Sequence, residues 1–212
     1  MADSKFTLHI CGMASTGKST IIQKLSKDSR YHALYTDYFE NCEHTPVFKD
    51  KSDQGIIQIL YTIHMASFRS VQKEDKENIQ DRSVLSDIFY ELVFAEMKDK
   101  TGILKLDSLM KVPLFCNIFR GFNILFFIAK PDCHELILEK MKARRNGIDI
   151  LSMEYVQAQW KIFTQLKTLG FTNFRFLDFS KDELFTQRQE EIVLKEVTSI
   201  FEEIKQRDKN DR

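Results

Sequence analysis

The sequence lacks the features by which several classes of protein are recognised. Its 31 basic and 31 acidic residues cancel, so no net charge attracts nucleic acid or an anionic membrane. Its four cysteines include no C-x-x-C pair, which argues against a disulfide or zinc framework and favours reduced thiols. No apolar signal core follows Met1, and the longest apolar run, 124–129, is too short to span a bilayer. We therefore expect a cytoplasmic protein without a nucleic-acid or membrane partner.

Internal repeats and linkers of distinct composition are also missing from the 212 residues. A chain of this length can bury a full core as one domain. Its hydrophobic content of 43% is normal for a globular protein. We therefore expect a single domain over residues 1–212, with a flexible charged tail at about 206–212.

The stretch 12–20 matches the phosphate-loop pattern G-x-x-x-x-G-K-S. An apolar strand pattern over 6–10 precedes it, and a helical pattern from Ile21 follows, which is the context that the motif requires. Glycines allow a tight turn whose N–H groups point at one anion, and the helix N-terminus adds positive charge. The motif predicts binding of a nucleoside triphosphate by Gly12, Met13, Ala14, Ser15, Thr16, Gly17, Lys18, Ser19 and Thr20. Lys18 would reach the terminal phosphates, and the Ser19 hydroxyl would ligate Mg²⁺.

Hydrophobic periodicity predicts strands that alternate with helices. The expected strands are 6–10, 32–36, 78–80, 123–129 and 174–179. The expected helices begin near 21 and cover 54–71, 84–97, about 106–110, 132–143, 153–169 and 187–205, with Ser83 a candidate N-cap. This order predicts an α/β fold with a five-stranded parallel sheet and helices on both faces.

Ligands of such sheets bind at the carboxyl ends of the strands, which directs attention to the residues there. Asp37 follows the second strand and could accept the proton of an attacking hydroxyl; a helix cap or solvated turn is the alternative. Asp81 could hold Mg²⁺ through water and Arg82 could hold phosphate or acceptor oxygens, unless the two form only a local ion pair. Arg144 and Arg145, with Lys142, could close a lid at about 142–152 over a transferring phosphate, or merely compensate a helix dipole.

Several of these segments together resemble the deoxyribonucleoside kinase family, which includes deoxycytidine, deoxyguanosine and mitochondrial thymidine kinases. The segment 12–20 is similar to the family's phosphate loop, and 81–87 (D-R-S-V-L-S-D) resembles its E-R-S motif. The segment 145–156 looks like its arginine lid, and 176–182 resembles the strand and loop that cup the adenine of ATP. The resemblance implies a P-loop kinase fold, ATP and Mg²⁺ as cofactors, Asp37, Arg82 and Arg145 as catalytic residues, and Lys181 and Asp182 beside the donor base.

The same resemblance implies a nucleoside pocket. By spacing, Gln58 stands where the family's glutamine reads the base, and Tyr61 and Met65 would line the pocket near Asp87. Met65 resembles the thymidine-accepting members and Asp87 the deoxycytidine-accepting ones, so the base preference stays open with pyrimidines ahead.

The chain also departs from the family pattern. Asp37 replaces the catalytic glutamate, and Tyr38 stands in place of the following proline. Gly147 and Ile148 replace the two lid acids, one of which holds the sugar 3′-hydroxyl, and only Asp149 is near enough to substitute. These departures fit a diverged member, such as a viral one, and they also fit a protein that is losing activity.

Three functions follow as alternatives. The leading one is ATP-dependent phosphorylation of a deoxyribonucleoside at its 5′-hydroxyl. A thymidylate kinase, acting on a nucleoside monophosphate, is the second, although Ser83 stands where that family usually has an aromatic residue. A catalytically silent P-loop protein that binds nucleotide or a partner is the third. Association into a homodimer is left open.

Overall fold

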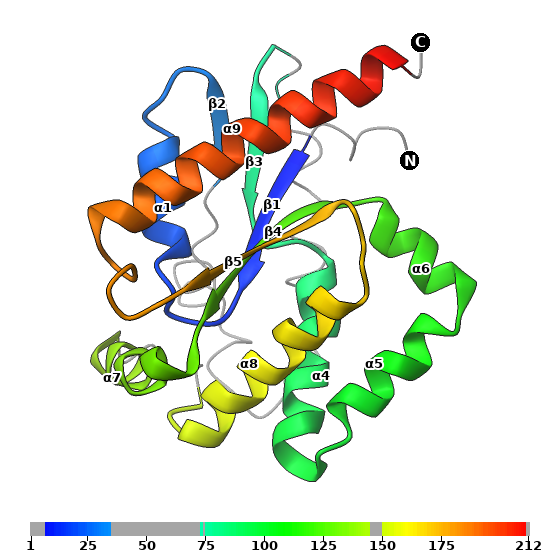
Figure 1. Cartoon of the computed structure of the whole chain (residues 1–212), viewed down its shortest axis with the longest axis vertical. Helices are drawn as coiled ribbons and strands as arrows, with labels where there is room; N and C mark the ends of the chain where they lie inside the picture. Colours follow the sequence, from blue (N-terminus) through cyan, green and yellow to red (C-terminus); the bar gives the residue numbers. More distant parts are fainter. Residues whose placement is uncertain (1–6, 35–72, 74, 145–149, 211–212) are drawn as a thin grey trace, which may run out of the picture.

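The computed structural model describes residues 7–34, 73, 75–144 and 150–210. In this part of the chain, five parallel strands form one sheet in the order β2-β3-β1-β4-β5 (Figure 1). The strands are β1 (Thr7–Gly12), β2 (Tyr31–Leu34), β3 (Glu77–Asp81), β4 (Asn123–Ala129) and β5 (Phe174–Phe179). The predicted α/β class and the five-stranded parallel sheet are confirmed.

Helices connect the strands and cover the sheet. They are α1 (Lys18–Leu25), α4 (Leu85–Asp99), α5 (Gly102–Met110), α6 (Pro113–Arg120), α7 (His134–Arg144), α8 (Met153–Thr168) and α9 (Gln187–Asn210), with a 3₁₀ turn, η4 (Pro131–Cys133), before α7. Within the described ranges, no helix has both the length and the apolar character needed to cross a membrane.

Phenylalanine rings form the core between the sheet and helices α4 and α8. The Phe126 ring of β4 lies 5.4 Å from that of Phe89 on α4 and 5.8 Å from that of Phe163 on α8. On β5, Phe174 and Phe176 also contact Phe126. Alternate strand residues share a face, so these contacts define the side of the sheet that α4 and α8 cover.

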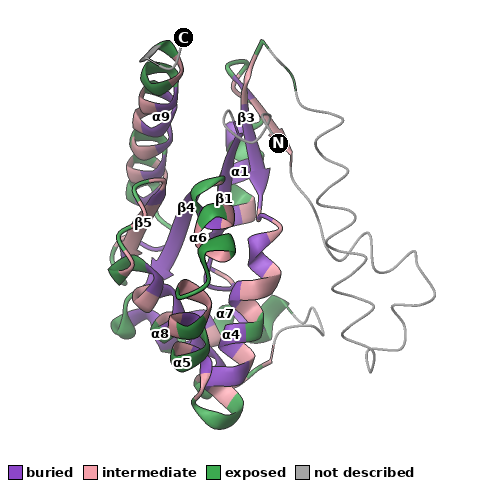
Figure 2. Cartoon of the chain, turned by 90° about the vertical axis from the view of Figure 1, so that its right-hand side faces the viewer, coloured by how far each residue is buried: buried purple, intermediate pink, exposed green. Residues whose placement is uncertain are grey.

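Helix α9 covers the other side. Arg175 lies between Phe174 and Phe176 in β5, so its side chain leaves the opposite face, where it pairs with Glu196 and Glu203 of α9. An ion pair between α1 and α9 joins these two helices at the same side. Figure 2 shows the result, in which β1 and β4 are buried while α9 carries one buried stripe.

Strand β3 is polar yet buried, and its side-chain contacts explain how. The Asn78 amide donates to the carbonyls of Lys73 and Lys76 and accepts from the Lys73 N–H, at 2.8, 3.1 and 3.0 Å. Buried polar groups are tolerated when they are bonded in this way. The strand is also longer than predicted, because Glu77 pairs with Tyr31 of β2 and Asp81 with Ile10 of β1.

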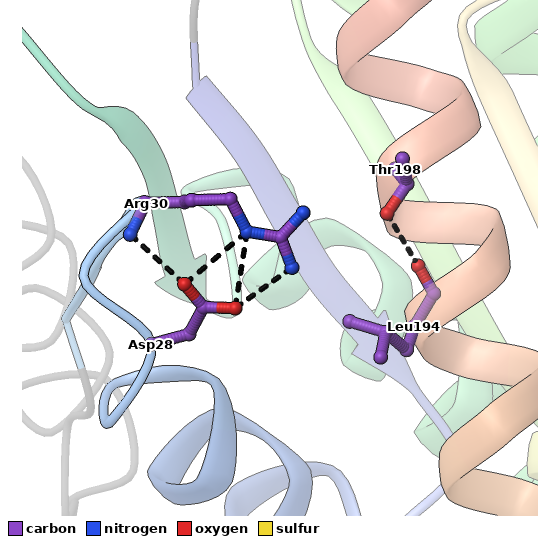
Figure 3. Close-up of polar contacts among 4 residues, drawn as sticks. All are labelled: Asp28, Arg30, Leu194 and Thr198. Carbon is purple, nitrogen blue, oxygen red and sulfur yellow. Dashed lines mark hydrogen bonds and ion pairs between the residues drawn. The ribbon is translucent and has the colours of Figure 1, made fainter.

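A short turn between α1 and β2 brings the chain back to the sheet (Figure 3). Arg30 donates to the Asp28 carboxylate through Nη2 at 2.7 Å and through its backbone N–H at 3.0 Å. In the same view, the Thr198 hydroxyl donates to the Leu194 carbonyl one turn earlier in α9. Both contacts are local, and neither contributes to the site.

Two predictions between β3 and β4 are wrong. Only one helix, at about 106–110, was expected before β4; it forms as part of α5, but a second helix, α6, follows it. Val112 is extended, and Pro113 starts α6 because its fixed φ suits a first helical position. Ser83 was expected to cap α4, but the N-cap is Val84. The Ser83 hydroxyl instead accepts from the Cys11 thiol, and the Ser83 N–H donates to Ser86 Oγ at 3.1 Å.

Other boundaries differ by less. The helix expected over 132–143 begins as the 3₁₀ turn η4 and continues as α7 to Arg144. Helix α9 extends past Lys205 to Asn210, so much of the tail expected to be flexible is helical. The expected strand 32–36 lies one residue earlier where it is described, and the expected helix 54–71 falls outside the described residues.

Candidate nucleotide-binding site

The loop between β1 and α1 has the geometry of a phosphate cradle. Gly12 has φ 118°, and a Cβ placed on it would lie 2.2 Å from the Phe127 carbonyl oxygen, so no side chain fits there. Ser15 and Gly17 also have positive φ, of 53° and 83°. Helix α1 starts after Gly17 without a side-chain cap, so its N-terminal dipole faces the loop.

The Lys18 side chain lies across this loop. Its Nζ donates to the Met13 carbonyl at 2.5 Å, to the Gly12 carbonyl at 3.3 Å and to Thr16 Oγ1 at 3.3 Å. The residue is only 7% exposed. The loop thus holds a positive charge against its own backbone, at the N-terminus of α1, where a polyphosphate can bind.

Two buried glutamines hold the loop from opposite helices. Gln159 of α8 accepts a hydrogen bond from the Ala14 N–H at 2.7 Å. Gln189 of α9 donates to the Thr16 carbonyl at 2.9 Å and accepts from the Phe185 N–H at 2.8 Å. The sequence reasoning missed both residues. The signal was present, because both glutamines fall on the apolar stripe of their helix. Gln159 lies three and four residues before the buried Ile162 and Phe163, and Gln189 lies four residues before the buried Val193.

Asp81 and Arg82 lie beside the loop at the end of β3. Asp81 is only 4% exposed and pairs with Ile10 of the neighbouring strand β1. Arg82 has φ 64°, which is strained for a residue other than glycine. Strand β1 holds this conformation from both sides, since the Arg82 N–H donates to the Ile10 carbonyl at 2.9 Å and the Arg82 carbonyl accepts from His9 Nδ1 at 3.0 Å.

Tyr90 of α4 connects this arginine with the loop, and the sequence reasoning missed it as well. The Arg82 guanidinium carbon lies 5.2 Å from the centroid of the Tyr90 ring. The Tyr90 hydroxyl donates to the Gly12 carbonyl at 3.2 Å. No motif identifies this tyrosine, because it lies in a helix of mixed composition and its partners come from β1 and β3.

The turns after β4 and β5 form the rim of the site. The Lys181 N–H donates to Asp132 at 3.2 Å, which lowers the pKa of that carboxyl. The Ser180 N–H and hydroxyl both donate to Glu183 at 2.9 Å, which lowers the pKa of Glu183. Phe185, which the sequence reasoning also missed, has φ 62° and is 41% exposed. Its ring lies beside Gly17.

The structure thus brings together part of the predicted site. The phosphate-loop residues, Asp81 and Arg82 meet at the carboxyl ends of β1 and β3, and Asp87 lies in the first turn of α4. Lys181 and Asp182 are exposed in the turn after β5. Lys142 and Arg144, expected in a lid loop, belong to the last turn of α7. Six predicted residues lie outside the described part of the chain, namely Asp37, Gln58, Tyr61, Met65, Arg145 and Asp149.

A dedicated metal cage is not part of this arrangement, since no three His, Cys, Asp or Glu side chains gather among the described residues. Magnesium does not need one, because it binds through one or two protein oxygens together with water and phosphate. Ser19 at the start of α1 and Asp81 at the end of β3 carry side-chain oxygens of this kind. The residues present therefore fit Mg²⁺.

Comparison with protein families and curated proteins gives little on function. No family model matches the chain. A relative from Lymantria dispar multicapsid nuclear polyhedrosis virus, named "Uncharacterized 33.9 kDa protein in PE 3′region", is 26% identical over 161 residues. The match covers 74% of this chain and 52% of that protein, so the chain spans about half the length of the relative.

Solved structures show what the fold resembles. Deoxyadenosine kinase from M. mycoides with bound dCTP matches with a TM-score of 0.59 at 19% identity, over 91% of this chain and 99% of the other. The same enzyme with bound dATP matches with a TM-score of 0.57 at 20% identity, over 91% of this chain and 99% of the other. With the products dCMP and a flexible dCDP bound, it matches with a TM-score of 0.56 at 21% identity, over 92% of this chain and 99% of the other. The chain has the P-loop kinase fold of these deoxyadenosine kinases.

Proposed function

We propose that the protein transfers the γ-phosphoryl group of ATP to the 5′-hydroxyl of a deoxyribonucleoside. The proposal rests on one observation: a buried Lys18 lies in a phosphate loop, beside Asp81 and Arg82, at the carboxyl ends of β1 and β3. Phosphoryl transfer is catalysed almost entirely by positioning and charge stabilisation, which loop amides, a lysine and arginines supply. The shared fold with deoxyadenosine kinases supports a nucleoside as the acceptor.

In this mechanism the loop amides and Lys18 hold the β- and γ-phosphates. Ser19 and Asp81 would hold Mg²⁺, which neutralises phosphate charge when bound. Arg82, joined by Arg145, stabilises the charge on the transferring phosphoryl group. The bond between the γ-phosphorus and the β–γ bridging oxygen breaks, a bond from phosphorus to the 5′-oxygen forms, and ADP leaves. Asp37 accepts the proton of the 5′-hydroxyl.

The remaining predicted residues complete the two ligand sites in this proposal. In this proposal Lys181 and Asp182, exposed in the turn after β5, flank the donor base, and Arg144, in the last turn of α7, binds the donor. Gln58, Tyr61, Met65 and Asp87 contact the nucleobase, and Asp149 the sugar. We propose the cytoplasm as the compartment, where free thiols such as Cys11, Cys116 and Cys133 stay reduced.

The test is a transfer assay with radiolabelled ATP and Mg²⁺ against a panel of nucleosides and nucleoside monophosphates. We expect label in a deoxyribonucleoside monophosphate and no transfer by the Lys18→Ala variant. Label appearing only in diphosphates would replace this proposal by a thymidylate kinase activity. Tight ATP binding without transfer to any acceptor would identify a catalytically silent P-loop protein.

A further inference from the structure

Tyr90 makes two polar contacts, one through its ring and one through its hydroxyl. Its ring faces the Arg82 guanidinium carbon at 5.2 Å, within the range of a cation–π interaction. Its hydroxyl donates to the Gly12 carbonyl at 3.2 Å, and Gly12 is the first residue of the phosphate loop. One side chain of α4 thus connects the arginine at the end of β3 with the loop at the end of β1.

The backbone of Arg82 is already fixed by hydrogen bonds, so the place of its guanidinium depends on how the side chain is held. Hydrogen bonds to the Ile10 carbonyl and from the His9 ring, both on β1, fix the Arg82 peptide groups in the left-handed conformation. The long arginine side chain has several rotatable bonds beyond this anchor, so the place of the guanidinium depends on the neighbours that contact it. The Tyr90 ring is a neighbour of this kind, and its own hydroxyl is tied to the loop.

We propose that Tyr90 is a positioning residue, which holds the Arg82 guanidinium at a fixed place relative to the phosphate loop. The inference rests on the proposed function, in which Arg82 acts on the transferring phosphoryl group. A misplacement of about 1 Å can cost on the order of a hundredfold in rate. Tyr90 therefore contributes to kcat through Arg82, without contacting either substrate itself.

A purely structural role for Tyr90 is the competing explanation, because its ring also lies 6.3 Å from that of Phe163 in the core. The two explanations predict different kinetics. Truncating a packing residue lowers stability and so lowers the amount of active protein, but kcat per folded molecule and KM stay at the parent values. Truncating a positioning residue lowers kcat per folded molecule, while KM for ATP and nucleoside stays nearly constant.

The experiment uses the full chain and three variants of α4. Tyr90→Leu removes the ring, Tyr90→Phe keeps the ring and removes the hydroxyl, and Phe94→Leu is the matched control. Phe94 lies one turn further along the same helix, is also half-buried, and stacks on Tyr155 at 6.1 Å instead of on an arginine. Steady-state kinetics and thermal unfolding are measured for each variant.

We expect Tyr90→Leu to lower kcat about ten- to a hundredfold with little change in KM, whereas Phe94→Leu changes stability alone. Tyr90→Phe should retain kcat within about threefold, because the ring face that holds the guanidinium remains. Combined with Arg82→Ala, the Tyr90→Leu change should slow the enzyme no further, since it acts through the same side chain. An NMR spectrum of the Arg82 Nε–H should show its ring-induced shift in Tyr90→Phe and not in Tyr90→Leu.

Failure of the inference and failure of the proposed function are distinguishable. If Arg82→Ala is slow while Tyr90→Leu matches the parent, or if the two effects multiply, the positioning role is refuted and the proposed function stands. If Tyr90→Leu behaves like Phe94→Leu, the tyrosine is a packing residue. If Arg82→Ala transfers phosphate at the parent rate, the proposed role of Arg82 and this inference both fail.

Discussion

The Gln159 side-chain oxygen accepts a hydrogen bond from the Ala14 backbone N–H at 2.7 Å, so helix α8 fixes one amide of the phosphate loop directly. Gln159 is fully buried. A buried N–H that loses its acceptor costs about 1–3 kcal/mol unless the surroundings move. The loop conformation therefore depends on a residue of a different helix, and the dependence can be tested.

We predict that Gln159→Met, which keeps the size and removes the acceptor, weakens ATP binding by about tenfold, equivalent to about 1.4 kcal/mol. Gln157→Met is the control, because Gln157 is exposed on the same helix. Isothermal titration with ATP and Mg²⁺ measures both affinities. Equal affinities for the two variants would show that the loop keeps its shape without Gln159.

Lys18 supplies the positive charge of the loop. We predict that Lys18→Ala abolishes triphosphate binding and turnover while the protein stays folded, because its ammonium donates to oxygens of the loop itself, on Gly12, Met13 and Thr16. Lys24→Ala, on the same helix and half-exposed, should bind ATP as the parent does. Nucleotide binding is measured by titration and folding by circular dichroism. A Lys18→Ala protein with the parent's turnover would exclude the loop as the active site.

Two glycines with positive φ should respond differently to alanine. At Gly12 a Cβ would meet the Phe127 backbone at 2.2 Å, whereas at Gly170 it would meet no atom within 4 Å. We predict a loss of about 3 kcal/mol or more in the free energy of unfolding for Gly12→Ala, and of about 1–2 kcal/mol for Gly170→Ala, where only the left-handed conformation is penalised. Urea denaturation measures both. Similar losses at the two positions would contradict the close approach of β1 to β4.

Asp37 carries the proposed role of base. We predict that Asp37→Asn binds ATP and nucleoside normally and transfers phosphate at least about a hundredfold more slowly, because the amide cannot accept the proton. Asp37→Glu restores the carboxylate and should recover much of the rate. Single-turnover kinetics separates transfer from binding. Normal transfer by Asp37→Asn would remove this residue from the mechanism, with Glu40 the nearby carboxylate to test next.

His134 should make stability depend on pH. Burial lowers its pKa, while a bond to the Ala129 carbonyl opposes the change. The unfolded chain, with a pKa of about 6.5, then takes up the proton first, so stability is full above that pH and declines as the pH falls toward the folded-state pKa. The loss is at most about 1.4 kcal/mol per pH unit for one group.

The variant His134→Asn can keep an N–H near the Ala129 carbonyl and cannot titrate. We predict a shallower decline of the unfolding free energy between pH 7 and 5 than in the parent. The pKa values of Asp132 and Glu183 are lowered from values already below this window, so those groups act at lower pH. His32→Asn controls for the loss of a histidine. Parallel curves for parent and His134→Asn would refute the prediction.

The sheet and the phosphate loop could be predicted because their signals are local. Strands β4 and β5 have the predicted bounds, since each is a short run rich in apolar residues between turn signals. The loop follows from a motif whose spacing reflects its own backbone geometry. Strand β3 was recognisable only from its neighbours, because its buried polar residues depend on bonds such as those of Asn78 with Lys73.

The contacts that hold the site could not be predicted, because they join distant parts of the chain. Ala14 and Gln159 are 145 residues apart in the sequence, and Thr16 and Gln189 are 173 apart. A glutamine on an apolar stripe signals a buried partner but not which one. Tyr90 lacks even this signal, since tyrosine is common on half-buried helix faces.

The left-handed conformation of Arg82 sets the stability of the fold against the proposed role of this residue in phosphoryl transfer. Glycine adopts a φ of 64° without strain, so thermodynamic stability alone would favour glycine at position 82. The hydrogen bonds that join this residue to the Ile10 carbonyl and the His9 ring involve only its backbone, and a glycine would make them equally well. Stability therefore does not account for an arginine at this position, whereas the proposed role of its side chain does.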